Sequence, residues 1–299
     1  MRLDDFLKKS PDAQPKRMAV AVAESEEVLE ALAEAVKLGI VEPILIGDAG
    51  KIRSIASKME LDFGTSEIVD RPDAASAAKT AVELVRSGQA KVLMKGSIVS
   101  SILMKAILNK ETGIRASNSL SIVSVIESPT LDRLLFLSDG GMIPYPTFEQ
   151  KIDIINNAVP VMRNLGVEQP KVACLAALEL VNPQMPPTME AAALALMSQR
   201  GQIKGCTVDG PYQLDNALFP EAVREKNLTS PSEVAGCADM VLVPNIETGN
   251  VMLKALRYLG GCGIAGLMAG ASVPVVMSSR ADTVVNKLRS IAVAIAAAN

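Results

Sequence analysis

Short apolar runs alternate with amphipathic stretches along almost the whole chain. MAVAVA (18–23), EPILIG (42–47) and KVLMKG (91–96) have the length of buried strands, and stretches with helical periodicity separate them. Apolar runs that alternate with helices in this way are typical of βαβ units around a parallel sheet. The pattern therefore predicts an α/β fold.

The same alternation continues to the end of the chain. Further strands are expected at 119–127, 134–139, 171–179, in the run that ends in VDGP, at 240–245 and at 272–279. Helices are expected after Ser25 as far as Gly39 and at 49–59, 74–85, 98–108, 147–165, 189–199, 216–225, 250–258 and 284–298. The pattern of the sequence changes after GGMIPYP (140–146). We therefore place a domain boundary near residue 142 and expect two α/β domains that pack against each other.

Composition narrows the class of protein. Apolar residues make up 49% of the chain and aromatic residues only 3%, which favours a core of Ala, Val, Leu, Ile and Met, as in parallel sheets covered by helices. The formal charge of -3 shows no basic excess, so we do not expect a nucleic-acid binder. No run of about 18 apolar residues predicts a membrane span, and the charged start lacks the apolar region of a secretory signal. The cysteines form no CxxC pair, which is typical of buried thiols in a reducing cytoplasm.

The chain contains no histidine, and this limits its chemistry. Ser-His or Cys-His activation and a histidine-ligated metal are excluded. Any proton transfer must use a carboxylate, an amine, a phenol or the substrate itself, and we expect no metal site and no permanently bound cofactor.

Polar residues gather where three apolar runs of the last third end. The three stretches are VDGPYQLDNA (208–217), ADMVLVPNIETGN (238–250) and PVVMSSRADT (274–283). Open α/β sheets place ligand sites at the carboxyl ends of their strands. We therefore expect these stretches to face one catalytic cleft.

The serine-arginine pair Ser279 and Arg280 stands between an apolar strand and the last helix. A guanidinium can bind two phosphate oxygens while the helix amides favour an anion, so the pair is a candidate phosphate site. The alternative is a capped helix with a solvated arginine.

Other candidates carry structural alternatives as well. Asp209 and Asp215 are expected to flank a Gly-Pro turn, where Asp215 is either a general base or a helix cap. Asn250 either caps its helix or binds a ligand. In KGSIVSS (95–101), the residues Lys95, Gly96, Ser100 and Ser101 suit an anion, although a surface turn has a similar composition.

One glycine motif does not indicate a dinucleotide site. Gly261, Gly263 and Gly266 spell GxGxxG, but they follow a helix, whereas a dinucleotide fingerprint follows the first strand of a βαβ unit. We interpret them as turn and helix-packing glycines. No P-loop GKS/T is present.

Taken together, the motifs resemble one family. VDGPYQLDNALFPEA, CADMVLVPNIETGNVMLKAL, PVVMSSRADTVVNKLRSIAVA, LMKGSIVSSILMKAIL, LSDGGMIPYP and PKVACLAALELVNPQMPPTMEAA resemble segments of the phosphate acetyl/butyryltransferase family. Within the family the chain most resembles the butyryltransferases, as the motifs SRAD, MKG and DGP and the short length indicate. The resemblance implies a two-domain, three-layer α/β/α fold like that of isocitrate and isopropylmalate dehydrogenases, with an active cleft between domains 1–142 plus 275–299 and 143–274. It also implies a homodimer or higher homo-oligomer.

The implied reaction is butyryl-CoA plus phosphate giving butyryl phosphate plus CoA, both acting as substrates. By this resemblance Arg280 clamps phosphate, and Ser279 donates to the oxyanion or leaving group. Gly96, Ser100 and Ser101 match the phosphate-side loop, while Asn250 matches a GN that opens a helix at the cleft. The carboxylate expected six residues after the arginine is replaced by Asn286.

The identity of the base therefore stays open between Asp215, Asp282 and the substrate itself. Asn245 stands where an aspartate is common, and Ile122 stands where butyryl relatives often carry histidine. The alternatives are a phosphate acetyltransferase, a hydroxy-acid dehydrogenase of the same fold, and a non-catalytic binder of CoA or acyl phosphate. The dehydrogenase needs a cluster of aspartates for its metal, and the sequence shows none.

Overall fold

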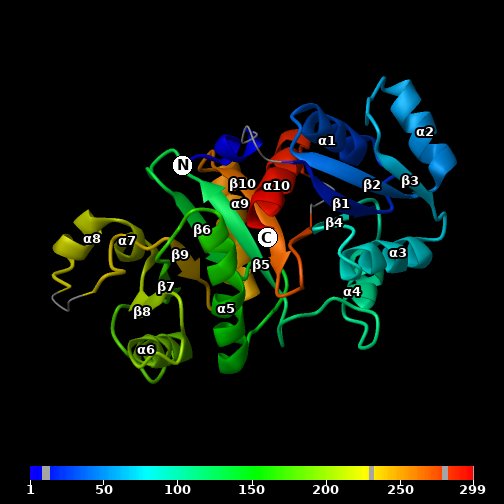
Figure 1. Ribbon diagram of the computed structural model, residues 1–299. Coiled ribbons are helices and arrows are strands. Elements are labelled where there is room, and N and C mark those ends of the chain that lie inside the picture. The colour runs from blue at the N-terminus through cyan, green and yellow to red at the C-terminus, as the bar shows by residue number, and fades with distance from the viewer. Residues whose placement is uncertain (9–13, 229–231, 278–281, 299) are drawn as a thin grey trace. The chain divides into compact units, whose positions relative to one another are not determined.

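The protein forms two compact units, each built around a β-sheet. The computed structural model describes residues 1–8, 14–228, 232–277 and 282–298. One unit, here the split unit, combines Arg2–Ser117 with Ala265–Asn299; the other, here the central unit, consists of Met1 and Asn118–Ile264. Both have the α/β architecture that the sequence predicts, with helices on the two sides of a sheet (Figure 1). The expected domain limits at residues 142 and 275 stay a prediction.

Parallel strands form most of the sheet in the split unit. The strands run in the order β3-β2-β1-β4-β11-β10, and only β10 is antiparallel to its neighbour β11. Their bounds are β1 Lys16–Ala21, β2 Val41–Gly47, β3 Glu67–Asp70, β4 Val92–Lys95, β10 Gly263–Ala269, whose residues from Ala265 on belong here, and β11 Val275–Val276. Ala19, Val20, Leu45, Leu93 and Met94 are fully buried, so the middle of this sheet carries the core.

Helices cover both faces of this sheet. α1 and α10 pack together on one side, and α3 and α4 pack together on the other (Figure 1). The bounds are η1 Leu3–Leu7, α1 Glu26–Lys37, α2 Ala49–Lys58, α3 Ala74–Arg86, α4 Ser100–Ile107 and α10 Val284–Ala297. Local side chains define several helix starts: Asp48 accepts from the backbone N–H of Lys51 at 3.0 Å, and Asp73 accepts from that of Ser76 at 2.8 Å.

The central unit has its own five strands in the order β5-β6-β9-β7-β8. Their bounds are β5 Ser121–Glu127, β6 Leu134–Ser138, β7 Lys171–Leu175, β8 Thr207–Tyr212 and β9 Met240–Leu242. Strands β6, β9, β7 and β8 are parallel, so their carboxyl ends meet at one edge. The helices are α5 Phe148–Asn164, α6 Pro186–Gln199, α7 Leu214–Leu218, α8 Pro220–Glu225 and α9 Ile246–Tyr258.

Two pairs of strands correct the expectation of a purely parallel sheet. β5 pairs with β6 antiparallel, and β10 pairs with β11 antiparallel. Only short loops, 128–133 and 270–274, join the members of each pair. A parallel pairing needs a crossover of a dozen or more residues, so these short connections require hairpins.

Several expected elements are also wrong in detail. Residues 216–225 form two helices, because Phe219 is extended and Pro220 opens α8. Gly263 and Gly266 lie in strand β10, and only Gly261, at φ +64°, is a turn glycine. β3 is missing from the sequence prediction because EIVD has no apolar run, and its four residues are exposed or half-buried.

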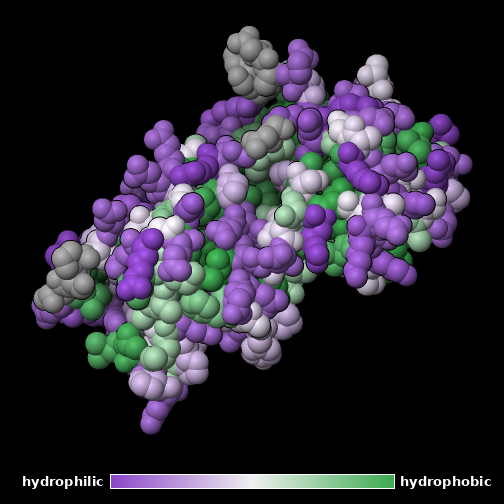
Figure 2. Space-filling view, turned by 60° about the horizontal axis from the view of Figure 1, so that its bottom comes forward, coloured by the Kyte–Doolittle hydropathy of each residue, from purple (hydrophilic) through white to green (hydrophobic). Residues whose placement is uncertain are grey.

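Within the described ranges, no helix has both the length and the hydropathy needed to cross a bilayer. Figure 2 shows one face of the molecule as mostly hydrophilic, with smaller hydrophobic areas between the polar residues. Some of the exposed apolar side chains lie on helices, as Val251 and Tyr258 do on α9.

Candidate functional site

The carboxyl edge of the central sheet brings several polar loops together. β6 ends at Ser138, β9 at Leu242, β7 at Leu175 and β8 at Tyr212, and these strands are parallel neighbours. The segments that follow these strands carry Asp139, Asn245, Glu179 and Asp215. This is the edge at which open α/β sheets hold their ligands, so a site at this position stays a prediction.

Asp209 lies inside β8, which corrects the expected Gly-Pro turn. The strand continues through Gly210 and Pro211 to Tyr212. The carboxylate of Asp209 accepts from the Gly210 N–H at 2.8 Å, from the Tyr212 hydroxyl at 2.6 Å and from the Ser232 hydroxyl. Burial, and then the bond to Asp209, raise the pKa of the Tyr212 phenol. Asp209 therefore holds Tyr212 and the segment at Ser232 in place.

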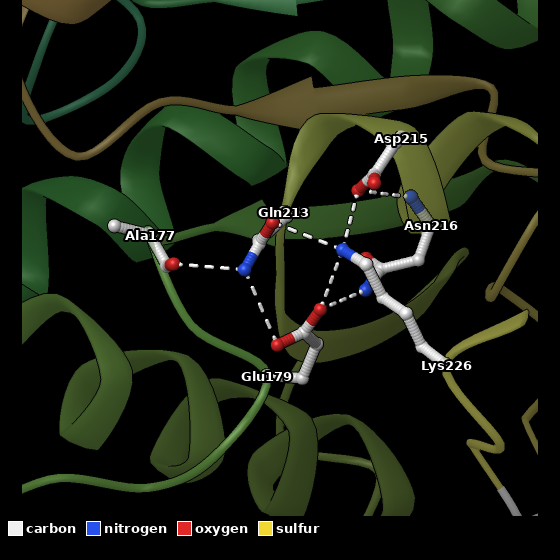
Figure 3. Close-up of polar contacts among 6 residues, drawn as sticks. All are labelled: Ala177, Glu179, Gln213, Asp215, Asn216 and Lys226. Carbon is white, nitrogen blue, oxygen red and sulfur yellow. Dashed lines mark hydrogen bonds and ion pairs between the residues drawn. The ribbon is translucent and has the colours of Figure 1, made fainter. Parts of the chain in front are cut away.

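A charged network follows the ends of β7 and β8 (Figure 3). The Lys226 ammonium lies 2.7 Å from a Glu179 carboxylate oxygen and 2.9 Å from one of Asp215, and it donates to the Gln213 amide oxygen at 2.9 Å. The side-chain amide of Asn216 also donates to Glu179, at 2.7 Å. We call Ala177, Glu179, Gln213, Asp215, Asn216 and Lys226 the Glu179 network.

The network changes the interpretation of Asp215. Its hydrogen bond to Lys226 lowers the pKa of the Asp215 carboxyl below its usual range. A general base works best with a pKa near the operating pH, and a lowered pKa weakens proton affinity. The geometry therefore favours a role in which Asp215 and Glu179 fix Lys226. Nor is Asp215 a helix cap, because α7 begins at Leu214 with Gln213 at its N-cap.

Asn216 is the buried polar member of the network. Its side chain is fully buried, and its amide oxygen has no hydrogen-bond partner among the described residues. Its backbone carbonyl accepts from the Gly236 N–H at 2.7 Å. Asn216 thus ties α7 to the segment before β9.

Asn250 lies inside α9 rather than at its start. The helix begins at Ile246, and the Asn245 side chain caps it by accepting from the Thr248 N–H at 2.9 Å. Asn250 is exposed, and its side-chain amide donates to the Gly140 carbonyl at 3.4 Å. The expected helix opening at Asn250 is therefore wrong, because the asparagine five residues earlier supplies the cap.

The loop after β6 packs closely on this helix. A Cβ on Gly249 would lie 2.8 Å from the Cα of Gly140, so this approach requires a glycine. The Asp139 carboxylate organises the loop by accepting from the backbone N–H groups of Gly141, Met142, Ile143 and Ile122 at 2.9 to 3.3 Å. Burial nevertheless raises the pKa of Asp139, because desolvation outweighs these four bonds.

In the split unit, a turn at the end of β4 carries further candidates. Lys95 is the last residue of β4 and is buried, and its ammonium lies 3.5 Å from the Gly96 carbonyl oxygen. The Gly96 N–H donates to the Ala21 carbonyl at 2.9 Å, and the Ser97 N–H donates to that of Val22 at 2.7 Å. We call residues 95–97 the Lys95 turn.

The Lys95 turn has no room for a side chain at Gly96. A Cβ there would lie 2.1 Å from the Val22 carbonyl oxygen and 2.8 Å from that of Ala21. Val22 itself has φ 59°, a left-handed conformation that is costly for a β-branched residue. This left-handed backbone conformation of Val22 directs its carbonyl toward the turn.

Ser100 and Ser101 open α4, and both are exposed. Asp282 is half-buried before α10, and its backbone carbonyl accepts from the buried ammonium of Lys287. Ser279 and Arg280 lie outside the described residues. The Thr283 hydroxyl caps α10 by accepting from the Asn286 N–H at 3.3 Å.

The candidates thus fall into two sets. The central unit holds Asp209, Asp215 and Asn250, and the split unit holds Lys95, Gly96, Ser100, Ser101 and Asp282. Asp209 and Asp215 both lie at the β8 end, whereas Asn250 belongs with the Asp139 loop. The sequence did not reveal the roles of Glu179, Lys226 and Asp139. For Asp139, the DGG at a strand end was a local signal. The pairing of Lys226 has no local signal, because its partners meet it only in the tertiary structure.

No group of three or more Cys, Asp or Glu side chains suited to holding a metal ion occurs in the described part of the chain. Cys174 is buried, and this burial raises the pKa of its thiol to about 12. Cys206 is half-buried, and burial raises the pKa of its thiol to about 11. Both thiols are therefore protonated and unreactive at neutral pH.

The fold is that of an α/β protein with polar loops at the strand ends, and comparison with known proteins gives its family. The chain matches the family described as phosphate acetyl/butaryl transferase over residues 3–81 and 73–295. It belongs to this family, as the six motifs predict.

Individual relatives agree with this assignment. The chain is 48% identical over 291 residues to a phosphate butyryltransferase from Clostridium acetobutylicum, covering 97% of this chain and 96% of the relative. It is 44% identical over 277 residues to a phosphate acetyltransferase from Thermotoga maritima, covering 93% of each. The crystal structure of a branched-chain phosphotransacylase from Enterococcus faecalis V583 superposes with a TM-score of 0.83 at 31% identity, covering 94% of this chain and 98% of that one.

Proposed function

We propose that this protein transfers a butyryl or similar short acyl group between coenzyme A and inorganic phosphate. The similarity over nearly the full length to phosphate butyryltransferase carries the proposal. A phosphate oxygen attacks the thioester carbonyl, a C–O bond forms and the C–S bond breaks. The products are butyryl phosphate and CoA, and the reaction runs either way.

Different residues of the chain bind the phosphate, stabilise the oxyanion and orient the substrate. Arg280 holds the phosphate, and Ser279 donates a hydrogen bond to the oxyanion or to the leaving sulfur. The Lys95 turn, Ser100 and Ser101 add donors on the phosphate side, and Asn250 orients the substrate. Asp209 holds Tyr212 in place.

The base follows from the electrostatics. Only a few per cent of a free thiol with a pKa near 8.5 is thiolate at pH 7, so a base aids the direction that consumes CoA. The lowered pKa of Asp215 weakens it as a base. We therefore favour Asp282 or the substrate phosphate as the acceptor of the proton.

The test is release of thiol from butyryl-CoA on addition of phosphate, followed with a thiol reagent. Arg280→Ala is expected to lower kcat/KM by about 100-fold or more, since it removes a charged donor to the transition state. Arg53→Ala, on the exposed side of α2, is the matched control and is expected to act as the parent protein. If phosphate releases thiol from neither butyryl-CoA nor acetyl-CoA, the result favours the non-catalytic binder.

A second arm of the assay addresses the acyl chain. Acetyl-CoA is run beside butyryl-CoA, because relatives at 44% and 48% identity carry the two names. Equal kcat/KM values would remove the narrower name and favour a phosphate acetyltransferase. A nicotinamide reduction with a hydroxy acid would instead support the dehydrogenase alternative.

The assembly proposed with this function is a homodimer or higher homo-oligomer in the cytoplasm. One face of α9 supports it: Val251 and Tyr258 are each 66% exposed, and Leu259, just past the helix, is 89% exposed. These positions follow helical spacing, and exposed apolar stripes of this kind mark contact surfaces. Light scattering of Leu259→Glu is expected to show a smaller species than the parent; an unchanged mass would remove this face from the interface.

A further inference from the structure

A basic groove lies at the amino-terminal ends of two strands in the split unit. It has a volume of ≈ 400 Å³, and its lining includes Arg86 at the end of α3, Lys91 before β4, Arg115, and Ser272 before β11. Two segments of the chain, residues 86–91 and the segment at Arg115, therefore bring three cations to the same groove. A volume of this size suits a small-molecule ligand.

The charges in the basic groove are not compensated. No acidic side chain lines it, and none of Arg86, Lys91 and Arg115 forms an ion pair or side-chain hydrogen bond with another described residue. All three are exposed. Like charges in one groove repel one another, so their convergence favours an anion that balances them.

A neighbouring groove makes the contrast clear. It lies between α3 and α4 with a volume of ≈ 610 Å³, and Lys79, Arg86 and Lys105 line it. Glu83 and Glu111 also line that groove, so acids offset most of its positive charge. Arg86 lines both grooves, whereas Lys91 and Arg115 line only the basic groove, which has no acidic side chain in its lining.

The walls of the basic groove are fixed by backbone bonds. The Lys91 N–H donates to the Arg17 carbonyl at 2.8 Å, and the Ser272 N–H donates to the Ile114 carbonyl at 2.8 Å. Arg115 forms an antiparallel bridge with Ala271. The groove is therefore preformed, and a ligand need not order these segments.

The basic groove is separate from the Lys95 turn. Lys91 precedes the first residue of β4, and Lys95 is its last residue. At about 3.3 Å per residue, the two ends of the strand lie roughly 13 Å apart. A ligand in the basic groove therefore approaches the opposite edge of this sheet.

We propose that the basic groove is a second binding site, for an anion that carries two or more linked phosphate groups. A single phosphate can engage one or two of the three cations, whereas a chain of phosphates can engage all of them. The two guanidinium groups can each bind a pair of phosphate oxygens, and Lys91 supplies a point charge. This inference does not depend on the proposed acyl transfer.

The test is calorimetric titration with inorganic triphosphate at about 50 mM salt, where phosphate contacts are weakly screened. The parent protein is expected to bind in a saturable, salt-dependent way, and Lys91→Gln/Arg115→Gln is expected to weaken binding at least 10-fold. Arg53→Gln, which removes an exposed cation on α2, is the matched control and is expected to bind as the parent does. Circular dichroism checks that each variant is folded.

Two outcomes overturn the proposal. One is no saturable binding of triphosphate by the parent protein. The other is binding that Arg280→Ala abolishes and Lys91→Gln/Arg115→Gln leaves unchanged, since triphosphate would then occupy the proposed phosphate site. A parallel titration with ATP shows whether a nucleoside adds affinity to the phosphate chain, and loss of ATP binding in the double variant supports the site equally.

Discussion

The Lys95 turn and the Glu179 network are polar regions at strand ends, but they are built in opposite ways. Backbone groups hold the Lys95 turn: the N–H groups of Gly96 and Ser97 bond to the carbonyls of Ala21 and Val22. Side chains hold the Glu179 network, where Lys226 joins Glu179, Gln213 and Asp215. In the first region the backbone sets the shape, and Ser100 and Ser101 nearby remain exposed. In the second, one ammonium is shared by two carboxylates.

This difference has a chemical consequence. Because backbone bonds set the shape of the Lys95 turn, the exposed hydroxyls of Ser100 and Ser101 nearby can donate to an incoming anion. A closed charge network is better suited to holding loops in position. We therefore propose that the Lys95 turn binds ligand and that the Glu179 network positions loops, and three substitutions test this division.

Gly96→Ala is expected to have the largest effect. Its Cβ would come within 2.1 Å of the Val22 carbonyl oxygen, so the backbone of the turn must move. A displacement of about 1 Å in a reacting site costs on the order of 100-fold in rate, and we expect at least that loss in kcat/KM for phosphate. Steady-state kinetics measure it.

Gly50→Ala is the matched control for that substitution. Gly50 lies in α2 of the same unit, and a Cβ there would meet only the Asp48 side chain, at 3.3 Å. Full activity in Gly50→Ala and a large loss in Gly96→Ala are expected together. Normal phosphate kinetics in Gly96→Ala would remove the turn from the site.

Lys226→Gln is expected to have an intermediate effect. It removes the cation shared by Glu179 and Asp215, whose side chains are 16% and 50% exposed. Because the network is partly solvated, we expect a loss of roughly 1 kcal/mol in the free energy of unfolding and about a 10-fold loss in kcat. Urea unfolding and kinetics measure the two quantities, and Lys58→Gln, at an exposed ion pair with Glu26, is the control.

The same variant has a pH signature. Since Lys226 lowers the pKa of Asp215 in the folded protein, the contribution of Asp215 to stability is present above its unfolded pKa of about 4. That contribution is lost as the pH falls through the lowered, folded-state pKa. The parent protein should therefore lose stability on acidification more steeply than Lys226→Gln. Parallel curves for the two proteins would contradict the pairing.

Val22→Gly is expected to have the smallest effect on stability. Glycine removes the strain at φ 59°, but it also removes a buried side chain and adds freedom to the unfolded chain. These terms oppose each other, so we expect a change within about 1 kcal/mol in the free energy of unfolding. The looser turn is expected to raise KM for phosphate severalfold. A loss of stability above about 3 kcal/mol would show that packing, rather than backbone direction, is the role of Val22.

The sequence predicts most of the fold because its signals are local. The runs at 42–47 and 74–85 become β2 and α3 almost residue for residue, since apolar periodicity and caps such as Asp73 act within a few residues. It fails where a short loop reverses a strand, as between β5 and β6, or where a proline breaks an apparent helix at Pro220. The short loop and the proline are both local signals. The prediction gave them less weight than the expectation of uninterrupted βαβ units.

The sequence indicates candidate residue types for the site but does not show their contacts. Asn250 looks like a helix cap from its neighbouring glycine, yet Gly249 is there for close packing on Gly140. Asp209 looks like a turn residue, yet it accepts a bond from Tyr212 within β8. In each case the sequence shows that the residue is unusual, and only the neighbours explain why.

Most strands and helices, the family and the candidate residues were available from the sequence alone, because periodicity and motif order are properties of the chain. The partners of those residues were decided by tertiary structure. Lys226 meets Glu179 across 47 residues of chain, and Asn250 meets Gly140 across 110. Such contacts, and the pKa values that depend on them, arise from Coulomb and hydrogen-bond interactions that act over a few ångströms in space whatever the separation in sequence.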